Sequence, residues 1–196
     1  FDGFGSFDPD VIYNRIEYMA AGLDTRIIFP KEFLIVAPHG GTIEPGTSEI
    51  TKKIAGERFN YYSFESMRQY GTEYISLHIT SHLFDEPGCI HWSDQHNWIV
   101  TIHGCNVQSQ QVYLGGLNYE LKEYVKDSLI EASFPVANDG HKYGGVHPRN
   151  ICNMGKRRAG LQIELAIPLR QPKEFESISS SIRNGLIKFL ENSDIK

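Results

Sequence analysis

Short apolar runs alternate with segments of helical spacing along this chain, and this alternation restricts its fold more than any other feature. The runs are rich in β-branched and aromatic residues, as strands are, and the other segments carry apolar residues three or four positions apart, as helices do. The predicted strands are 25–29, 33–37, 59–64, 74–80, 97–104, 111–116 and 160–167. The predicted helices are 8–19, 47–55, one beginning near Pro87 after the cap candidates Asp85 and Glu86, 117–132 and 174–193. Strands alternating with helices predict an α/β fold: an open mixed, largely parallel sheet flanked by helices.

Length and charge limit the kinds of partner that this chain can have. Its 196 residues, 40% hydrophobic and 22% charged, are typical of a soluble globule, and we predict a single domain over 1–196. The net charge of -5 argues against a general nucleic-acid binder. The apolar run 33–37 is far shorter than the roughly 20 residues of a membrane span. We therefore expect a monomer that binds neither nucleic acid nor membrane.

Polar side chains stand at or near the ends of three predicted strands. His39 follows FLIVAP, His103 closes NWIVTIH and Glu164 lies within LQIELA. Ligands of open α/β sheets bind beyond the carboxyl ends of the strands. Glu44 follows His39 by five residues, in a loop that also contains Gly-Gly and Pro-Gly pairs. These four residues are therefore candidates for one site.

The spacing of His39 and Glu44 excludes a helical metal motif. Five residues of helix turn the chain by about 500°, which leaves the two side chains about 140° apart. They can converge from a curled loop, and the Gly and Pro residues around Glu44 favour one. A plain turn between strand and helix, with an incidental His and Glu, is the alternative, and the residues alone do not decide between the two.

Two imidazoles and one carboxylate are a common ligand set of catalytic zinc, with water in the fourth position. His39, Glu44 and His103 supply that set. A zinc-bound water needs a group that accepts its proton, and Glu164 is the candidate. The alternation in LQIELA places Glu164 opposite the larger apolar residues. A carboxylate there would be costly in a closed core and reasonable in a cleft.

An ordered set of short segments extends from Ala37 to Leu165. These segments are APHGGTIEPGTSEI, HITS followed by FDEP and Cys89, IHGC, RNICN and GLQIEL. Together they resemble the poly-γ-glutamate hydrolase family of bacteriophages and Bacillus-type bacteria. The resemblance implies a fold similar to zinc carboxypeptidases and cleavage of γ-glutamyl amide bonds. It also implies action outside the cell on a capsule or secreted polymer, by a protein that is secreted or released by lysis.

The same resemblance implies one zinc ion held by His39, Glu44 and His103, with Glu164 as general base. One departure from zinc carboxypeptidases is clear. Those enzymes carry His-x-x-Glu, whereas four residues separate His39 from Glu44 here. The loop therefore differs from theirs.

The segment 147–160 is basic in an otherwise acidic chain. It contains Arg149, Lys156, Arg157 and Arg158. Arginine pairs bidentately with carboxylates, and poly-γ-glutamate carries one α-carboxylate per residue. We therefore predict substrate binding by Arg149, Asn150 and Arg158, and by His78 of the HITS segment. A solvated surface loop is the alternative for Lys156 and Arg157.

His78 and His82 have a spacing that suits a metal pair on a helix. The segment 74–80 is predicted as a strand, however, in which such residues lie about 13 Å apart. They are therefore not predicted as a ligand pair.

Two other functions are compatible with these residues. The first is a carboxypeptidase-like or acyl-amino-acid amidohydrolase with a small substrate. The second, from a different class, is a catalytically inactive polyanion-binding module. A ladder of products from the polymer would exclude the first, and binding without cleavage would support the second.

Overall fold

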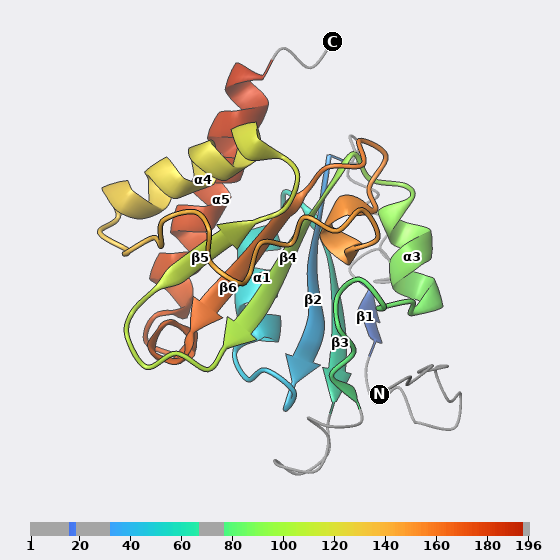
Figure 1. The fold of residues 1–196 in the computed structure, drawn as a ribbon, viewed down its shortest axis with the longest axis horizontal. Coiled ribbons are helices and arrows are strands. Elements are labelled where there is room, and N and C mark those ends of the chain that lie inside the picture. Colours follow the sequence, from blue (N-terminus) through green and yellow to red (C-terminus); the bar gives the residue numbers. More distant parts are fainter. Residues whose placement is uncertain (1–15, 19–31, 67–76, 194–196) are drawn as a thin grey trace.

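A six-stranded sheet, in the order β1-β3-β2-β4-β6-β5, forms the centre of the molecule (Figure 1). The computed structural model describes residues 16–18, 32–66 and 77–193. The strands are β1 (Ile16–Tyr18), β2 (Phe33–Gly41), β3 (Asn60–Ser66), β4 (Trp98–Cys105), β5 (Val112–Gly115) and β6 (Leu161–Ala166). The central strands β3, β2, β4 and β6 run parallel, and the edge strands β1 and β5 pair antiparallel with their neighbours. This confirms the mixed, largely parallel sheet that the sequence predicts.

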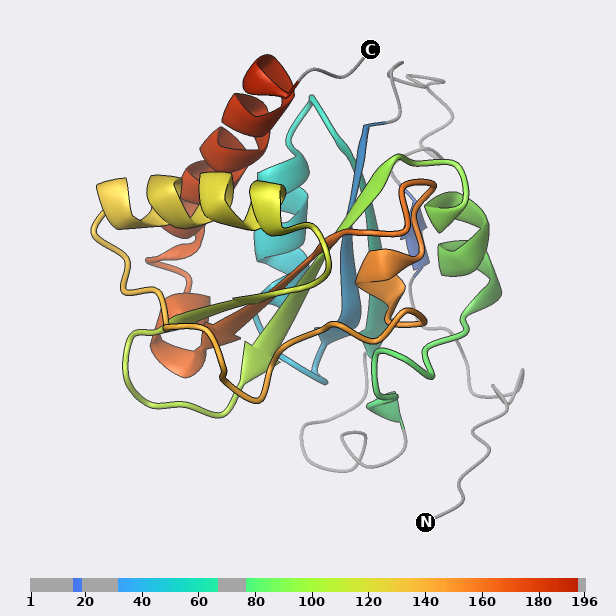
Figure 2. The ribbon, with the colours of Figure 1, turned by 45° about the horizontal axis from the view of Figure 1, so that its top comes forward.

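Helices cover both faces of this sheet. The helices are α1 (Thr47–Ala55), α3 (Pro87–Ser93), α4 (Tyr119–Glu131), α5 (Phe175–Asn192) and the short 3-10 helices η1 (Ile151–Asn153) and η2 (Ile167–Arg170). The helices α1, α4 and α5 pack on one face, and α3 and η1 lie on the other (Figure 2). None of the helices in the described ranges is both long and apolar enough to cross a membrane.

The central strands β3, β2 and β4 contribute to two cores, because their side chains point alternately to the two faces. In β2, Phe33 and Ile35 pack under α1, α4 and α5, whereas Leu34 and Val36 pack on the side of α3 and η1. Strands that are buried on both faces have continuous apolar runs in their sequence. This explains why β2 begins with the uninterrupted apolar run FLIVA.

An irregularity at the carboxyl end of β2 changes the direction of His39. Between Ala37 and Gly40, β2 advances three residues while β3 advances two. Strict alternation would direct His39 toward the core under the three long helices. The extra residue turns it to the opposite face, where its ring centroid lies 6.5 Å from that of Phe84. Pro38, which has no N–H to donate, lies within this irregular stretch.

Two predicted elements are wrong in the part that the structure describes. Residues 77–80 of the predicted strand 74–80 are not a strand: Leu77 and Ile79 pack against the α3-side core, and the Ile79 carbonyl bonds to His39 instead of a sheet neighbour. Residues 16–18 of the predicted helix 8–19 form β1, because their backbone pairs with the edge of β3. The rest of both segments, and the predicted strand 25–29, lie outside the described residues.

Candidate active site

The carboxyl ends of the parallel strands border a cleft of about 710 Å³. All four residues predicted from the strand ends line it: His39 from β2, Glu44 from the following loop, His103 from β4 and Glu164 from β6. His103 and Glu164 face each other in the register of β4 and β6. The parallel topology therefore gathers residues that are up to 125 positions apart in the chain.

The glycine-rich turn brings Glu44 back to His39. The Glu44 N–H donates to the His39 carbonyl at 2.9 Å, and Glu44 Oε1 lies 3.1 Å from His39 Nδ1. From β4, the Gly104 N–H donates to Glu44 Oε2 at 2.8 Å. A Cβ on Gly40 would lie 2.3 Å from Ser48 Oγ, so this turn needs a glycine there. The predicted curled loop is confirmed.

The hydrogen bonds of His39 leave one ring nitrogen for a cation. Its Nε2–H donates to the Ile79 carbonyl at 2.7 Å, and a carbonyl can only accept. Nδ1 then faces Glu44 Oε1 at 3.1 Å and His103 Nδ1 at 3.2 Å. Because a carboxylate also only accepts, this geometry requires positive charge at the centre, either a proton on Nδ1 or a metal ion. Two imidazoles and a carboxylate suit zinc.

The charges of these groups follow from burial and from one another. Burial opposes a charge on His39, but the adjacent Glu44 carboxylate outweighs it and raises the pKa of His39. Burial opposes ionisation of Glu44 as well, but His39 and the other imidazoles lower the pKa of Glu44. Burial lowers the pKa of His103 to about 3, so its ring is neutral at pH 7 and has a lone pair for a metal.

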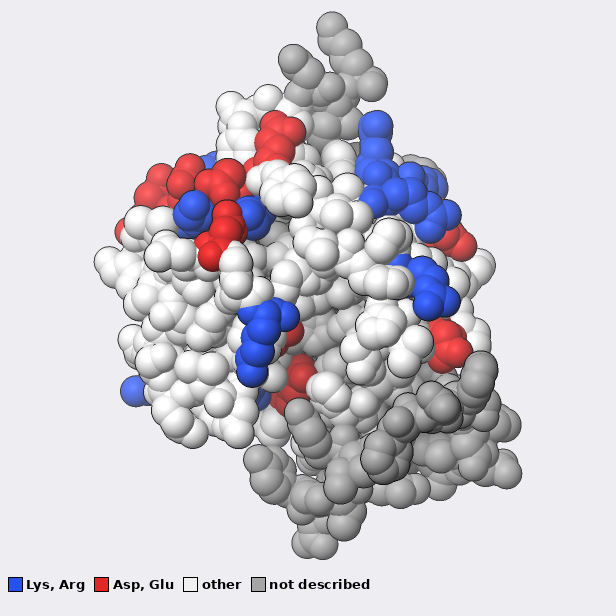
Figure 3. All heavy atoms as spheres, viewed as in Figure 1, with Lys and Arg blue, Asp and Glu red and all other residues white. Residues whose placement is uncertain are grey.

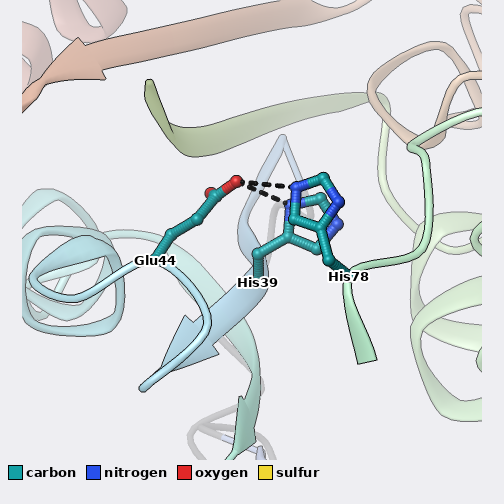
Figure 4. Close-up of side chains that lie close together, drawn as sticks. All are labelled: His39, Glu44 and His78. Atoms are coloured by element: carbon teal, nitrogen blue, oxygen red, sulfur yellow. Dashed lines mark hydrogen bonds and ion pairs between the residues drawn. The ribbon is translucent and has the colours of Figure 1, made fainter. Parts of the chain in front are cut away.

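His78 joins this group, although the sequence predicts only a role in substrate binding for it. Its ring stacks on that of His39 with centroids 4.2 Å apart, and its Nε2 lies 3.2 Å from Glu44 Oε1. Figure 4 shows both rings directed at the Glu44 carboxylate. Ligand atoms of His39, Glu44 and His78 all lie within 4.8 Å of one another. The structure therefore offers His78 as well as His103 for the third ligand.

Glu164 is a buried carboxyl group at the cleft. Only 9% of it is exposed, and its Oε1 accepts a hydrogen bond of 3.2 Å from Gln162 Nε2. Burial and the negative charge of Glu44 raise the pKa of Glu164 to about 8. A carboxyl group that titrates near neutral pH is typical of a general acid or base.

Residues 22–188 match the model of the family described as poly-gamma-glutamate hydrolase. The chain belongs to this family. YndL of Bacillus subtilis (strain 168) is 35% identical over 140 residues, which are 70% of this chain and 54% of YndL. The chain thus spans just over half the length of that curated relative.

Solved structures support the fold. A bacteriophage poly-gamma-glutamate hydrolase superimposes with a TM-score of 0.78 at 23% identity, over 83% of this chain and 86% of the other. A zinc-free apo structure of YndL superimposes with a TM-score of 0.72 at 30% identity, over the same shares.

The residues predicted to bind substrate are not all at the cleft. Asn150 lines it, but its amide donates to Gln162 Oε1 at 2.8 Å and its Oδ1 accepts from the Cys152 N–H. Arg149 is exposed and is not among the described residues that line the cleft. Arg158 is exposed at the opposite end of the sheet, since the neighbouring Arg157 N–H bonds to the backbone just before β4.

Cations are sparse around the described cleft. Among its described lining residues, Lys142 is the one Lys or Arg. Figure 3 shows basic side chains on this face in separate groups rather than as one continuous surface. The structure thus brings Lys142 to the site, which the sequence analysis missed because Lys142 lies in no recognisable motif.

The RNICN segment has a structural task. Asn153 is fully buried, and its Oδ1 accepts from the N–H groups of Leu117 and Gly160. Its Nδ2 donates to the carbonyls of Gly145 and His147, which both line the cleft. One side chain therefore holds the loop that forms a cleft wall.

Proposed function

We propose that this chain is a zinc-dependent hydrolase of the γ-glutamyl amide bonds of poly-γ-glutamate. The convergence of His39, Glu44 and His103 beside Glu164, in a cleft at the carboxyl end of the sheet, carries the proposal. Membership of the family supports the substrate. The zinc-free state described for a YndL structure makes zinc the first metal to test.

The residues fit such an ion. His39 and His103 would offer Nδ1, and Glu44 a carboxylate oxygen, from buried positions. The Ile79 carbonyl fixes the His39 tautomer, and Ser81 Oγ lies 3.3 Å from His103 Nε2, as partners behind metal ligands do. When bound, zinc would supply Lewis acidity, which polarises the scissile carbonyl and acidifies water.

Glu164 acts as the base in this proposal. It takes a proton from the attacking water and delivers it to the leaving amine. Without a cation its pKa is raised to about 8. A positive charge beside Glu44 would lower that pKa, because opposite charges favour the ionised carboxylate. Gln162, which donates to Glu164 and is itself held by Asn150, keeps the carboxylate oriented.

The substrate would lie along the cleft wall. The polymer carries one α-carboxylate per residue, and the Lys142 ammonium can pair with one of them. Arg149 stands next to Asn150 in the chain and remains a second candidate for a residue further along the polymer. In this proposal the substrate is a capsule or a secreted polymer outside the cell.

The test combines metal analysis with product analysis. Purified protein should contain about one zinc ion per chain and should convert poly-γ-glutamate to a ladder of shorter products. A chelator should abolish the activity, and zinc should restore it. Cleavage of small acyl-amino acids alone would favour the amidohydrolase alternative, and binding without cleavage would favour an inactive module. Full activity in metal-free protein would refute zinc dependence.

A further inference from the structure

Arg170 makes an unusual set of hydrogen bonds next to the candidate metal site. It is the last residue of η2, which follows β6 directly. Its guanidinium donates to three backbone carbonyls: Nη1 to Pro45 at 2.6 Å, Nε to Leu165 at 3.1 Å and Nη2 to Cys105 at 3.4 Å. One side chain thus joins three segments that are distant in sequence.

Each of those carbonyls belongs to a residue that directly follows part of the site. Pro45 follows Glu44, and Leu165 follows Glu164. Cys105 follows Gly104, whose N–H donates to Glu44 Oε2 and which itself follows His103. The three bonded segments are therefore those that carry a carboxylate ligand, the base and an imidazole ligand.

The chain leaves room for this guanidinium. A Cβ on Gly104 would lie 2.5 Å from Arg170 Cζ, far inside contact distance. Gly46 has a φ of +93°, and a Cβ there would lie 2.6 Å from the Arg170 carbonyl oxygen. Gly104 directly follows His103 and Gly46 follows Glu44 by two positions, and a side chain at either glycine would collide with Arg170.

Arg170 lies beside the turn that carries Glu44, but it is not among the described lining residues of the first cleft. It lines a second cleft of about 740 Å³, which shares Glu44, Gly104 and Asn106 with the first. All three of its hydrogen bonds are to the protein backbone. This geometry suits a residue that orders the site more than one that contacts substrate.

We propose that Arg170 is a positioning residue whose guanidinium fixes Glu44, His103 and Glu164 relative to one another. The planar fork of arginine can serve three carbonyls in fixed directions, which the single ammonium of lysine cannot. This inference rests on the proposed metal site, and it predicts that Arg170 affects zinc affinity without being a ligand.

The experiment compares Arg170→Ala with a matched control, Arg183→Ala. Arg183 also donates to a backbone carbonyl, that of Ile54 at 2.8 Å, and packs over a glycine, but it is not among the described residues of either cleft. The zinc dissociation constant of metal-free protein is measured by competition with a chromophoric chelator, together with Tm, kcat and KM.

The dissociation constant for zinc should rise about 10- to 100-fold in Arg170→Ala, as for other residues that orient metal ligands. In Arg183→Ala the zinc dissociation constant should stay within about twofold of the wild-type value, even if the Tm falls as far as in Arg170→Ala. The value of kcat should fall more than KM rises. Arg170→Lys should recover part of the zinc affinity, and millimolar guanidinium should restore part of it in Arg170→Ala.

Equal zinc affinity in wild type, Arg170→Ala and the control would overturn this inference and leave the proposed function intact. Wild-type protein that binds no zinc would instead refute the proposed function. If Arg170→Ala does not fold, the zinc affinities of Arg170→Lys and Gly104→Ala test the inference instead. In Gly104→Ala the added methyl group displaces the guanidinium while Arg170 itself is kept. Unchanged zinc affinity in both variants would overturn the inference.

Discussion

Replacing Glu164 by glutamine should separate catalysis from stability. The amide has the shape of the carboxyl group and can keep the hydrogen bond from Gln162, but it cannot accept a proton. General acid–base catalysis contributes about 10²- to 10⁴-fold, so turnover should fall by that factor, or by roughly 3 to 5 kcal/mol in activation free energy. Zinc should remain bound, since Glu164 is not among the proposed ligands.

Although Glu164→Gln should lower turnover, it should raise the stability of the metal-free protein at alkaline pH. Burial and the Glu44 charge raise the pKa of Glu164 from its ordinary value of 4.5 to about 8. The folded wild type therefore holds this proton more tightly than the unfolded chain, and it loses stability as the pH rises from 4.5 to 8. This loss is about 5 kcal/mol at most, because each unit of pKa between 4.5 and 8 corresponds to about 1.36 kcal/mol. Glutamine at this position does not titrate, so Glu164→Gln should be the more stable protein at pH 8 and above.

The assay is urea denaturation of both proteins in the presence of a chelator, at several pH values between 5 and 9. Initial rates on the polymer and zinc content are measured on the zinc-loaded forms. Because all other titrating groups are shared, the difference between the two stability curves reports on Glu164. Parallel stability curves would refute the raised pKa, and near-normal turnover with zinc bound would assign the base to another residue.

Three further predictions concern ligands, substrate and scaffold. His103→Ala should lose zinc by elemental analysis whereas His78→Ala keeps it, and the reverse result would exchange their roles. Lys142→Ala should lower kcat/KM on poly-γ-glutamate about 10-fold or more, and Arg149→Ala should lower it less. Neither variant should change kcat/KM on a neutral, esterified analogue, and equal losses on both substrates would exclude carboxylate recognition. Asn153→Ala should destabilise the fold by roughly 3 kcal/mol or more, because buried backbone groups lose their partners, and an unchanged Tm would show that water replaces them.

Local pattern was enough to predict much of this protein. Short runs rich in β-branched and aromatic residues predicted β2, β4 and β6, because such residues favour strands. The alternation within β6 predicted that Glu164 points away from the larger apolar residues. The free backbone of Gly and the fixed φ of Pro both favour turns, and these residues around Glu44 predicted the turn that returns it to His39. Each of these inferences depends on neighbours within a few residues.

Other features were decided by partners that are distant in sequence. The extra residue in β2 turns His39 into the cleft, and it is visible only in the pairing with β3. Arg158, which follows RNICN by only a few residues, lies at the far end of the sheet because its segment packs against the start of β4. The contacts of Arg170 join the ends of β4 and β6 to the turn that follows β2, and the distance between these segments depends on strand order. Periodicity is a property of one segment, whereas strand register, bulges and shared hydrogen-bond partners arise only when segments pack together, and for that physical reason only the tertiary structure could place them.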